Sequence, residues 1–246
     1  MKHVKIEAFD CADAWFKVVS AIWTQGEHFN VGNGSEEGDT KKLDITIHIS
    51  HPENRPLVAD TAPTDMNHVQ AYGLEYLYTD TLNDHPYTYG WRLQHPVNQK
   101  AEIIKAILKN PANRQLTMTI RIPEDAVPTK VINGGIVKHE PPCLTIIDVE
   151  VLNGKVNFTS YFRSWDAYGG LCENIAGLQI FFEAFVNDIN EVLIAEGKSD
   201  NELLKTGELI FHSKNCHIYR RQYPFVEKLL TTKSSSFATK MNENKP

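Results

Sequence analysis

The chain has 246 residues, 41% of them hydrophobic and 23% charged, so it can bury one sizeable core without disulfides or metal ions. Its 25 Lys and Arg are outnumbered by 31 Asp and Glu, which gives a net charge of −6. This balance excludes the broad basic surface of proteins that follow a nucleic-acid backbone. No apolar run approaches the roughly 18 residues that a membrane span requires, and we expect neither a signal peptide nor a membrane anchor.

The four cysteines, Cys11, Cys143, Cys172 and Cys216, form no Cys-x-x-Cys pair. Four cysteines in a chain of this length are not typical of a disulfide framework, which small secreted domains need more than large ones. We therefore expect a reduced, cytoplasmic setting, in which each thiol serves either packing or chemistry.

The first half of the chain shows helical and strand periodicities in alternation. Apolar residues at helical spacing predict a helix over residues 13–23, and apolar residues at every second position predict a strand over residues 43–49. Further helices are expected over residues 65–78 and 98–109, the second of which ends at Asn110-Pro111.

Three strands and one long helix dominate the second half. The strands are expected at residues 143–151, 155–162 and 208–211, and Asn153-Gly154 between the first two favours a type I′ hairpin turn. The helix expected over residues 175–193 has too many apolar residues for one stripe, so it should be largely buried. These elements predict an α+β fold in which helices pack on an extended sheet.

Residues 1–230 are expected to form a single domain. No internal repeat interrupts this range. Residues 231–246 are polar, rich in Thr, Ser, Lys and Asn, and predict a disordered tail.

Cys143 follows Pro141-Pro142 at the start of a predicted strand. Two prolines remove two backbone donors and stiffen the approach, so this thiol stands at a fixed strand entrance. A nucleophilic thiolate is one interpretation of this cysteine. A small buried hydrophobic residue is the other.

A polar loop precedes the long helix. Its chemistry-bearing side chains are Arg163, Ser164, Asp166 and Asn174. Gly169-Gly170 between them gives the backbone the freedom to approach a ligand closely. A solvated loop with an ion pair between Arg163 and Asp166 would also explain the composition. Asn174 could serve either a ligand or the N-cap of the helix.

His217 and Tyr219 would point to one face if the last strand continues through them. Their pair is compatible with a half-buried sheet edge or with a binding site. His212, Cys216 and His217 suggest zinc ligands, but no second ligand cluster lies at a suitable spacing, so we expect no metal site.

Five ordered phrases of this sequence resemble the thymidylate synthase family, in particular its short, archaeal-type branch. They are Tyr87-Thr88-Tyr89-Gly90, Asn110-Pro111-Ala112-Asn113-Arg114, Pro141-Pro142-Cys143-Leu144, Arg163-Ser164-x-Asp166 with Gly170 and Asn174, and His217-x-Tyr219. The resemblance covers roughly residues 70–230. It implies the α+β fold of that family, a large mixed sheet packed with helices, in which one sheet face forms the interface of a homodimer.

The resemblance also implies a covalent mechanism on a pyrimidine nucleotide. Cys143 would add as a thiolate to carbon 6 of the ring and leave an enolate that is nucleophilic at carbon 5. Arg163 would lower the pKa of that thiol. Together with Ser164, and with Arg114, which in the family crosses from the other subunit, it would bind the 5′-phosphate. A homodimer with shared active sites follows from this.

Substrate recognition is implied for five residues. Asn174 would pair its carboxamide with the oxygen at position 4 and the N3 hydrogen of uracil, and so favour dUMP over a cytosine nucleotide. His217 and Tyr219 would bind the 3′-hydroxyl of the sugar. Asp166 and Gly170 would bind the reduced pterin, 5,10-methylenetetrahydrofolate or a relative such as methylene-tetrahydromethanopterin.

Proton transfer is implied for two further residues. Tyr89 would assist removal of the proton at carbon 5. Glu75 is matched to the glutamate that the family carries on an early helix, and an exposed helix residue is its other interpretation.

The expected product is dTMP, and two alternatives stay open. In a 5-hydroxymethylase, water would take the place of hydride at the same intermediate. A non-catalytic homologue would only bind the nucleotide. Departures from the long branch of the family motivate these alternatives. Gln115 and Phe162, which replace an arginine and a glutamine, motivate the non-catalytic homologue, and the tail after Thr231, which lacks an apolar lid to exclude water, motivates the hydroxymethylase. Leu144 also replaces a histidine, and residues 31–37 are acidic where an arginine loop is usual.

Overall fold

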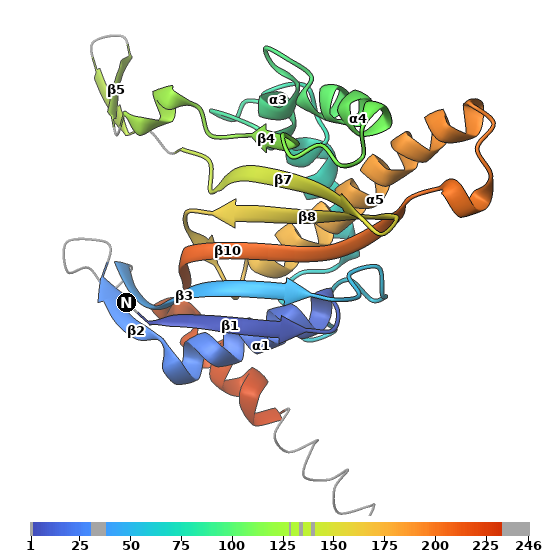
Figure 1. Ribbon diagram of the computed structural model, residues 1–246. Helices are drawn as coiled ribbons and strands as arrows, with labels where there is room; N and C mark the ends of the chain where they lie inside the picture. The colour runs from blue at the N-terminus through green and yellow to red at the C-terminus, as the bar shows by residue number, and fades with distance from the viewer. Residues whose placement is uncertain (1, 31–37, 128, 133–134, 139–140, 233–246) are drawn as a thin grey trace, which may run out of the picture.

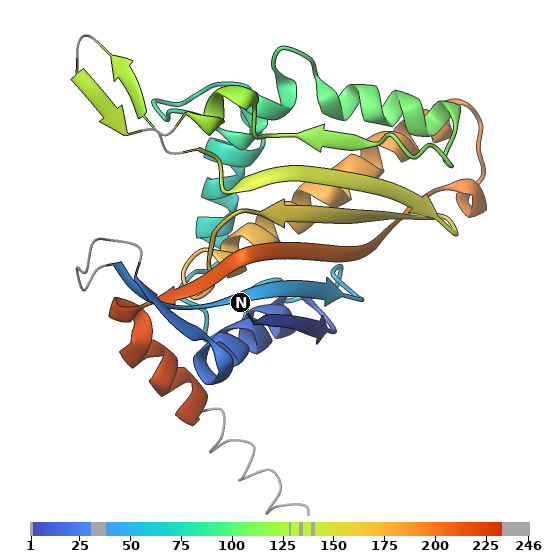
Figure 2. The same ribbon diagram turned by 60° about the vertical axis from the view of Figure 1, so that its left-hand side comes forward.

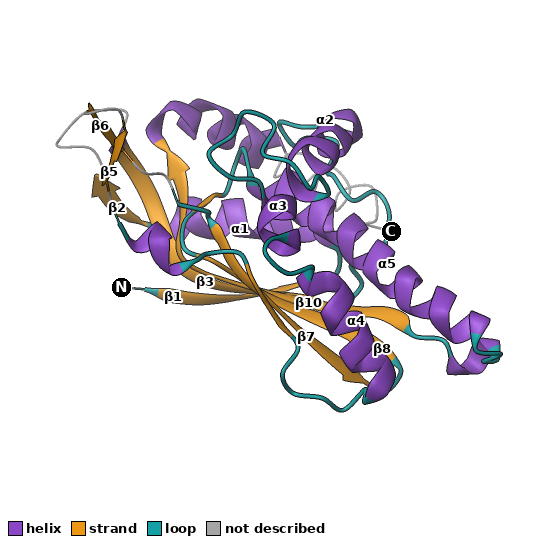
Figure 3. Cartoon of the chain, turned by 90° about the horizontal axis from the view of Figure 1, so that it is seen from above, coloured by secondary structure: helices purple, strands orange, loops and turns teal. Residues whose placement is uncertain are grey.

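The computed structural model describes residues 2–30, 38–127, 129–132, 135–138 and 141–232. Within them, an eight-stranded mixed sheet carries the helices on one of its faces, and the other face is open (Figure 3). The α+β architecture expected from the sequence is therefore confirmed. None of the described helices is long and apolar enough to cross a membrane.

The main sheet is built from strands of very different length. They are β1 (His3–Ala8), β2 (Glu27–Asn30), β3 (Asp39–Ile49), β4 (Thr117–Thr119), β7 (Leu144–Leu152), β8 (Lys155–Phe162), β9 (Trp165–Asp166) and β10 (Lys205–Tyr219). Their order is β1-β3-β10-β8-β7-β4, with β2 beside β3 and β9 beside β10 (Figures 1 and 2). Strand pairs β1/β3 and β10/β8 are parallel, and β3/β10, β8/β7 and β7/β4 are antiparallel. A separate hairpin consists of β5 (Thr129–Ile132) and β6 (Gly135–Lys138).

The helices of the described chain lie on one side of this sheet. They are α1 (Cys11–Gln25), α2 (Met66–Tyr72), α3 (Tyr89–Gln94), α4 (Gln99–Lys109) and α5 (Leu171–Ala195). A π-helical turn, Gly73–Leu77, continues α2, and 3₁₀ turns occur at Pro123–Ala126, Asp200–Glu202 and Arg220–Gln222. Residues 223–232 are again helical, while residues 31–37 and 233–246, with the acidic loop and most of the expected tail, lie outside the described residues.

The predicted elements are present, and the largest difference concerns β10. The sequence indicated a strand over residues 208–211 only, whereas β10 spans 15 residues. Its polar stretch Ser213-Lys214-Asn215 resembles a turn in sequence. In the structure the register of β10 against β3 shifts between Ser213 and Cys216, so the strand absorbs this stretch as an irregularity and continues.

The hairpin between β7 and β8 is the one that the sequence predicts. Asn153 and Gly154 have φ angles of 52° and 74°, and Leu152 pairs with Lys155 across the turn. Both turn residues are thus left-handed, as a type I′ turn requires.

Side-chain alternation separates the core from the open face. On β3, Ile45 and Ile47 are buried under the helices, whereas Thr46 and His48 face the open side. On β8, the ring of Phe158 lies 3.9 Å from that of Phe182 in α5. This packing fixes α5 against the sheet, and with it the loop that leads from β8 into α5.

Candidate active site

Cys143 lies half-buried at the entrance of β7. Its carbonyl oxygen accepts a hydrogen bond from the backbone N–H of Arg163 at 2.9 Å, which ties it to the end of β8. Just beyond it, the pairing of β7 with β8 shifts register between Leu144 and Ile146. Such bulges redirect the side chains beside them and are frequent next to active sites. Strand pairing and the preceding prolines therefore both determine where this cysteine points.

Arg163 is held beside the cysteine by the carbonyl groups of the two prolines. Its Nε donates to the oxygen of Pro142 at 3.0 Å, and its Nη2 donates to that of Pro141 at 2.6 Å. The alternative of an ion pair with Asp166 is wrong, because the Asp166 carboxylate accepts from backbone N–H groups and a glutamine instead. A guanidinium fixed next to a cysteine favours its thiolate form.

Three tyrosines surround the Cys143 segment on the helix side of the sheet. The ring centroid of Tyr76 lies 5.6 Å from that of Tyr87 and 4.9 Å from that of Tyr89. The N–H of Leu144 donates to the Tyr89 hydroxyl at 3.4 Å. Burial raises the pKa of all three phenols, and the nearby Cys143 sulfur raises it further. These side chains are therefore neutral hydroxyl groups at physiological pH.

Asn174 is held by a tryptophan of the polar loop. The indole Nε1 of Trp165 donates to its Oδ1 at 2.9 Å, and the Trp165 ring stacks on Phe162 at 3.9 Å. The alternative that Asn174 caps the helix is wrong, because α5 begins at Leu171 with Gly170 in the N-cap position. The helix starts four residues earlier than the sequence indicated, and no side chain caps it. Asn174 therefore lies in the first turn of α5, where its Oδ1 accepts from Trp165 and does not cap the helix.

Asp166 is joined to the end of β10 by a buried glutamine. Gln222 Nε2 donates to both carboxylate oxygens of Asp166, at 3.0 and 2.9 Å, while Gln222 Oε1 accepts from the backbone N–H of Tyr219 at 2.9 Å. The N–H groups of Tyr168 and Gly169 also donate to Asp166 Oδ1. Gln222 thus connects Asp166, which is expected to contact the pterin, with Tyr219, which is expected to contact the nucleotide.

His217 and Tyr219 lie on β10 with their rings in contact, 4.7 Å apart and perpendicular at 89°. His217 Nδ1 lies 3.1 Å from the carbonyl oxygen of Asn215, whose side-chain Nδ2 donates to Ser164 Oγ at 3.2 Å. Burial lowers the pKa of His217, so its imidazole is neutral near pH 7. Asn215 therefore links Ser164, which is predicted to bind the phosphate, to His217, which is predicted to bind the sugar.

The β10 residues considered as zinc ligands, His212 and Cys216, point to different sides of the sheet. His212 bonds to Thr46 on the open face at 3.0 Å, whereas the Cys216 side chain is fully buried in the core. In the part of the chain that the structure describes, no three His, Cys, Asp or Glu side chains gather closely enough to hold a metal ion.

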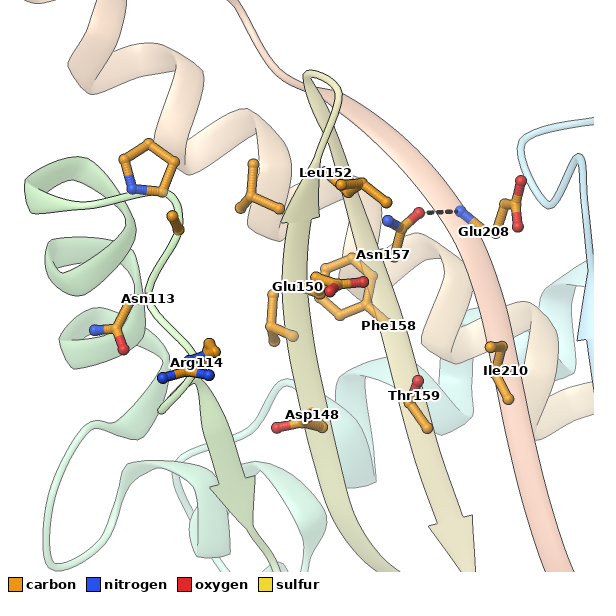
Figure 4. A pocket seen from close by; sticks show the side chains of 14 residues that line it. Asn113, Arg114, Asp148, Glu150, Leu152, Asn157, Phe158, Thr159, Glu208 and Ile210 are labelled. Atoms are coloured by element: carbon orange, nitrogen blue, oxygen red, sulfur yellow. Dashed lines mark hydrogen bonds between the residues drawn. The ribbon is translucent and has the colours of Figure 1, made fainter.

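Arg114 lies apart from the Cys143 cluster. It is exposed on the loop that follows α4, at the edge of an open cavity of about 610 Å³ on the open sheet face (Figure 4). The floor of this cavity is formed by β7, β8 and β10 and includes the outward-facing side chains of Asp148 and Glu208. None of the described residues around Cys143 lines it. Within one protomer, Arg114 is therefore not brought to the thiol.

Glu75 is exposed on the π-helical turn, next to Tyr76 of the tyrosine cluster. Its backbone carbonyl accepts a hydrogen bond from Asn83 Nδ2 at 2.9 Å. This position fits the interpretation of Glu75 as an exposed helix residue.

Several residues around the site were not found from the sequence: Tyr72, Tyr76, Trp165, Asn215 and Gln222. Trp165 occupies the variable position of the Arg-Ser-x-Asp phrase, and an aromatic residue inside so polar a loop was a usable signal. Tyr72 and Tyr76 are spaced for one helix face, which also suits plain core packing. Gln222 carried no signal, because its partner lies 56 residues away.

Comparison with known proteins supports the family that the sequence motifs indicate. The sequence profile of a family described as thymidylate synthase matches residues 65–245, more than half of the chain. A protein of Methanosarcina acetivorans is 26% identical over 228 residues, which cover 92% of this chain and 94% of its own. One from Methanothermobacter thermautotrophicus is 24% identical over 240 residues, with 92% and 97% covered. Both relatives carry the name "Putative thymidylate synthase". The chain therefore belongs to the thymidylate synthase family and to its archaeal-type branch.

Proposed function

We propose that this protein is a homodimeric thymidylate synthase, which converts dUMP to dTMP with 5,10-methylenetetrahydrofolate or a related methylene-pterin as co-substrate. One observation carries the proposal. Neighbouring segments hold three groups in fixed positions: the thiol of Cys143 at a strand entrance, the guanidinium of Arg163 on the carbonyl group of Pro142, and the carboxamide of Asn174 on the Trp165 indole. Covalent activation of a uracil ring needs a thiolate, a cation and a polar group for the base.

In the proposed mechanism, the Cys143 thiolate forms a bond to carbon 6 of uracil. The electron pair of the 5,6 double bond moves toward the carbonyl at position 4 and yields an enolate, whose carbon 5 attacks the methylene group. The pterin would supply this carbon, whose bonds to the pterin nitrogens would break, and the hydride that completes the methyl group. The bond between the Cys143 sulfur and carbon 6 would then break and release dTMP with the thiolate restored. Tyr89, which accepts a hydrogen bond from the residue after Cys143, is proposed to assist loss of the carbon 5 proton.

The 5′-phosphate is proposed to bind Arg163 and Ser164 of one protomer and Arg114 of the partner subunit. A phosphate dianion requires several cationic donors. Because Arg114 lines the open sheet face of its own protomer, it can contribute only across that face. The open face is therefore the proposed dimer interface, and each site is shared between subunits.

The other ligands are proposed to divide between sugar, base and pterin. His217 and Tyr219 would hold the 3′-hydroxyl, with the imidazole neutral because burial lowers its pKa. Asn174 would read the uracil edge. Asp166 and Gly170 would contact the pterin.

Product analysis tests the activity. Purified protein, dUMP and methylenetetrahydrofolate should give dTMP and dihydrofolate, identified by mass spectrometry. A product of 5-hydroxymethyl-dUMP with tetrahydrofolate would instead assign the protein as a hydroxymethylase. If neither product forms with this pterin or with methylene-tetrahydromethanopterin, the catalytic proposal fails.

Adduct formation tests the nucleophile. Incubation with 5-fluoro-dUMP and the methylene-pterin should leave a covalent adduct on the peptide that contains Cys143. Cys11→Ser is the matched control, because burial raises the pKa of the Cys11 thiol to about 12 and keeps it protonated. Cys143→Ser should abolish the adduct, and Cys11→Ser should retain it. Tight binding without any adduct would favour the non-catalytic homologue.

A further inference from the structure

Tyr72, the last residue of α2, buries a hydroxyl group that the proposed roles do not use. Its oxygen is inaccessible to solvent and has no hydrogen-bond partner among the described residues. The ring lies against Gly177 of α5, where a Cβ atom would come within 2.9 Å of Tyr72 Cε1. A buried hydroxyl without a partner is unfavourable unless a ligand or water completes it. Because Gly177 has no side chain, the Tyr72 ring can approach α5 closely enough to bury its hydroxyl oxygen.

The surroundings of this hydroxyl connect it to the candidate active site. The Tyr72 ring stacks with that of Tyr76 at 6.0 Å, and Tyr76 contacts Tyr89 at 4.9 Å. Tyr89 in turn bonds to the N–H of Leu144, directly after the nucleophile. Burial raises the pKa of Tyr72 well above its ordinary value. The Asn174 side chain lies close enough to offset part of that rise, although it forms no well-aligned hydrogen bond with the Tyr72 hydroxyl. The group is therefore a neutral donor between the base-reading amide and the tyrosines around Cys143.

We propose that Tyr72 is a catalytic residue that donates a hydrogen bond to the oxygen at position 4 of the pyrimidine. The inference rests on the proposed function, because this oxygen gains negative charge only when a thiolate adds to the ring. The sulfur to carbon 6 bond forms, the electron pair of the 5,6 double bond moves to the enolate oxygen, and the proton stays on Tyr72. A donor aimed at an oxyanion in a dry site stabilises the transition state more than the ground state. Glu75, by contrast, exposes its side chain to solvent.

The test compares Tyr72→Phe with Tyr78→Phe. Both phenols contact Gly177, but the Tyr78 hydroxyl donates to the Gly177 carbonyl at 3.0 Å, whereas the Tyr72 hydroxyl has no partner in the described chain. We expect Tyr72→Phe to lower kcat on the order of 100-fold, as for loss of one oxyanion donor, with little change in the KM for dUMP. Its melting temperature should fall less than that of Tyr78→Phe, since the Tyr72 hydroxyl has no hydrogen-bond partner among the described residues as close as the one that Tyr78 has. Tyr78→Phe should melt lower and keep its kcat.

A modified substrate separates a chemical role from a structural one. In 4-thio-dUMP a sulfur atom, which is a poor hydrogen-bond acceptor, replaces the oxygen at position 4. Wild type should discriminate between dUMP and 4-thio-dUMP more strongly than Tyr72→Phe does, and as strongly as Tyr78→Phe does. An active wild type whose discrimination and kcat survive in Tyr72→Phe would overturn the Tyr72 proposal alone. A wild type without any turnover would overturn the proposed function as well.

Discussion

The indole Nε1 of Trp165 donates to Asn174 Oδ1 over 2.9 Å and so determines which end of the Asn174 amide faces the indole. An indole can only donate, so it must face the carbonyl oxygen of the amide and not its NH₂ group. The NH₂ group is then directed elsewhere, as a base with a carbonyl at position 4 requires. Specificity for uracil would thus depend on a residue that does not touch the base.

Trp165→Phe removes this donor and keeps the ring that stacks on Phe162. Freed from the indole, the amide can rotate and present either end, so selection of dUMP over dCMP by kcat/KM should fall about 5-fold, equivalent to about 1 kcal/mol. Trp15→Phe is the matched control, because it also loses an indole hydrogen bond, to the carbonyl oxygen of Tyr168. Unchanged selectivity in Trp165→Phe, or an equal loss in Trp15→Phe, would contradict the argument.

The contact of Trp165 with Asn174 marks a limit of what the sequence predicts about the site. The strands and the hairpin around Cys143 were predictable, since alternation and Asn153-Gly154 act through neighbours in the chain. The motif residues were found because the resemblance named them. The contact between Trp165 and Asn174 was missed because the start of α5 was expected at residue 175, which kept a cap open as an alternative role for Asn174. Contacts that depend on where a helix begins follow only once tertiary packing is known.

Tyr72 and Gln222 were missed for a different physical reason. Each meets its partner across a large sequence separation, Tyr72 at Gly177 and Gln222 at Asp166, and no local period encodes that contact. The role of Arg114 depends on a second chain, so neither the sequence periodicity nor one protomer can supply it.

Gln222 should act as a positioning residue for Asp166. Gln222→Met keeps the length of the side chain but removes the donor to both carboxylate oxygens. Because hydrogen bonds to charged groups are worth about 1.5–3 kcal/mol, we expect the KM for the pterin to rise at least about 10-fold while the KM for dUMP changes little. Gln222→Glu should be worse, since it sets two carboxylates side by side.

Gln179→Met supplies the matched control for that prediction. Gln179 is also buried and also donates to a carboxylate, Glu183 Oε1 at 2.9 Å, but it lies outside the proposed site. Steady-state kinetics on all three variants should show the pterin effect only at Gln222. Equal KM values for the pterin in Gln222→Met and Gln179→Met would refute the positioning role.

Mixing two inactive variants, Cys143→Ala and Arg114→Ala, should restore activity in hybrid dimers. In a shared site, Cys143 and Arg114 come from different subunits, so a hybrid of Cys143→Ala and Arg114→Ala contains one intact site. After subunit exchange, a one-to-one mixture should regain about one quarter of wild-type activity, since half of the dimers are hybrids with one working site each. A mixture of Cys143→Ala and Arg163→Ala should stay inactive, because those two residues belong to the same half-site. Recovery in neither mixture, with exchange verified by native mass spectrometry, would reject the shared site.

Breaking the buried ion pair between Arg92 and Asp125 should lower the free energy of unfolding. Arg92 Nη2 lies 3.0 Å from Asp125 Oδ1, and the two side chains are only 7% and 0% exposed. Arg92→Met leaves the Asp125 carboxylate buried without its cation, which should lower the free energy of unfolding by about 3–5 kcal/mol. Urea denaturation at one fixed protein concentration measures this loss.

The double variant Arg92→Met with Asp125→Leu distinguishes the cost of breaking this pair from its net contribution. Arg92 Nε is buried without a hydrogen-bond partner in the described structure, so part of the desolvation of the guanidinium is never compensated. Replacing both charges by apolar side chains of similar size should therefore recover most of the stability lost in the single variant. A double variant as unstable as Arg92→Met would mean that the pair contributes through its geometry, for example through the bond from the Ile122 N–H to Asp125 Oδ2, and not through charge compensation.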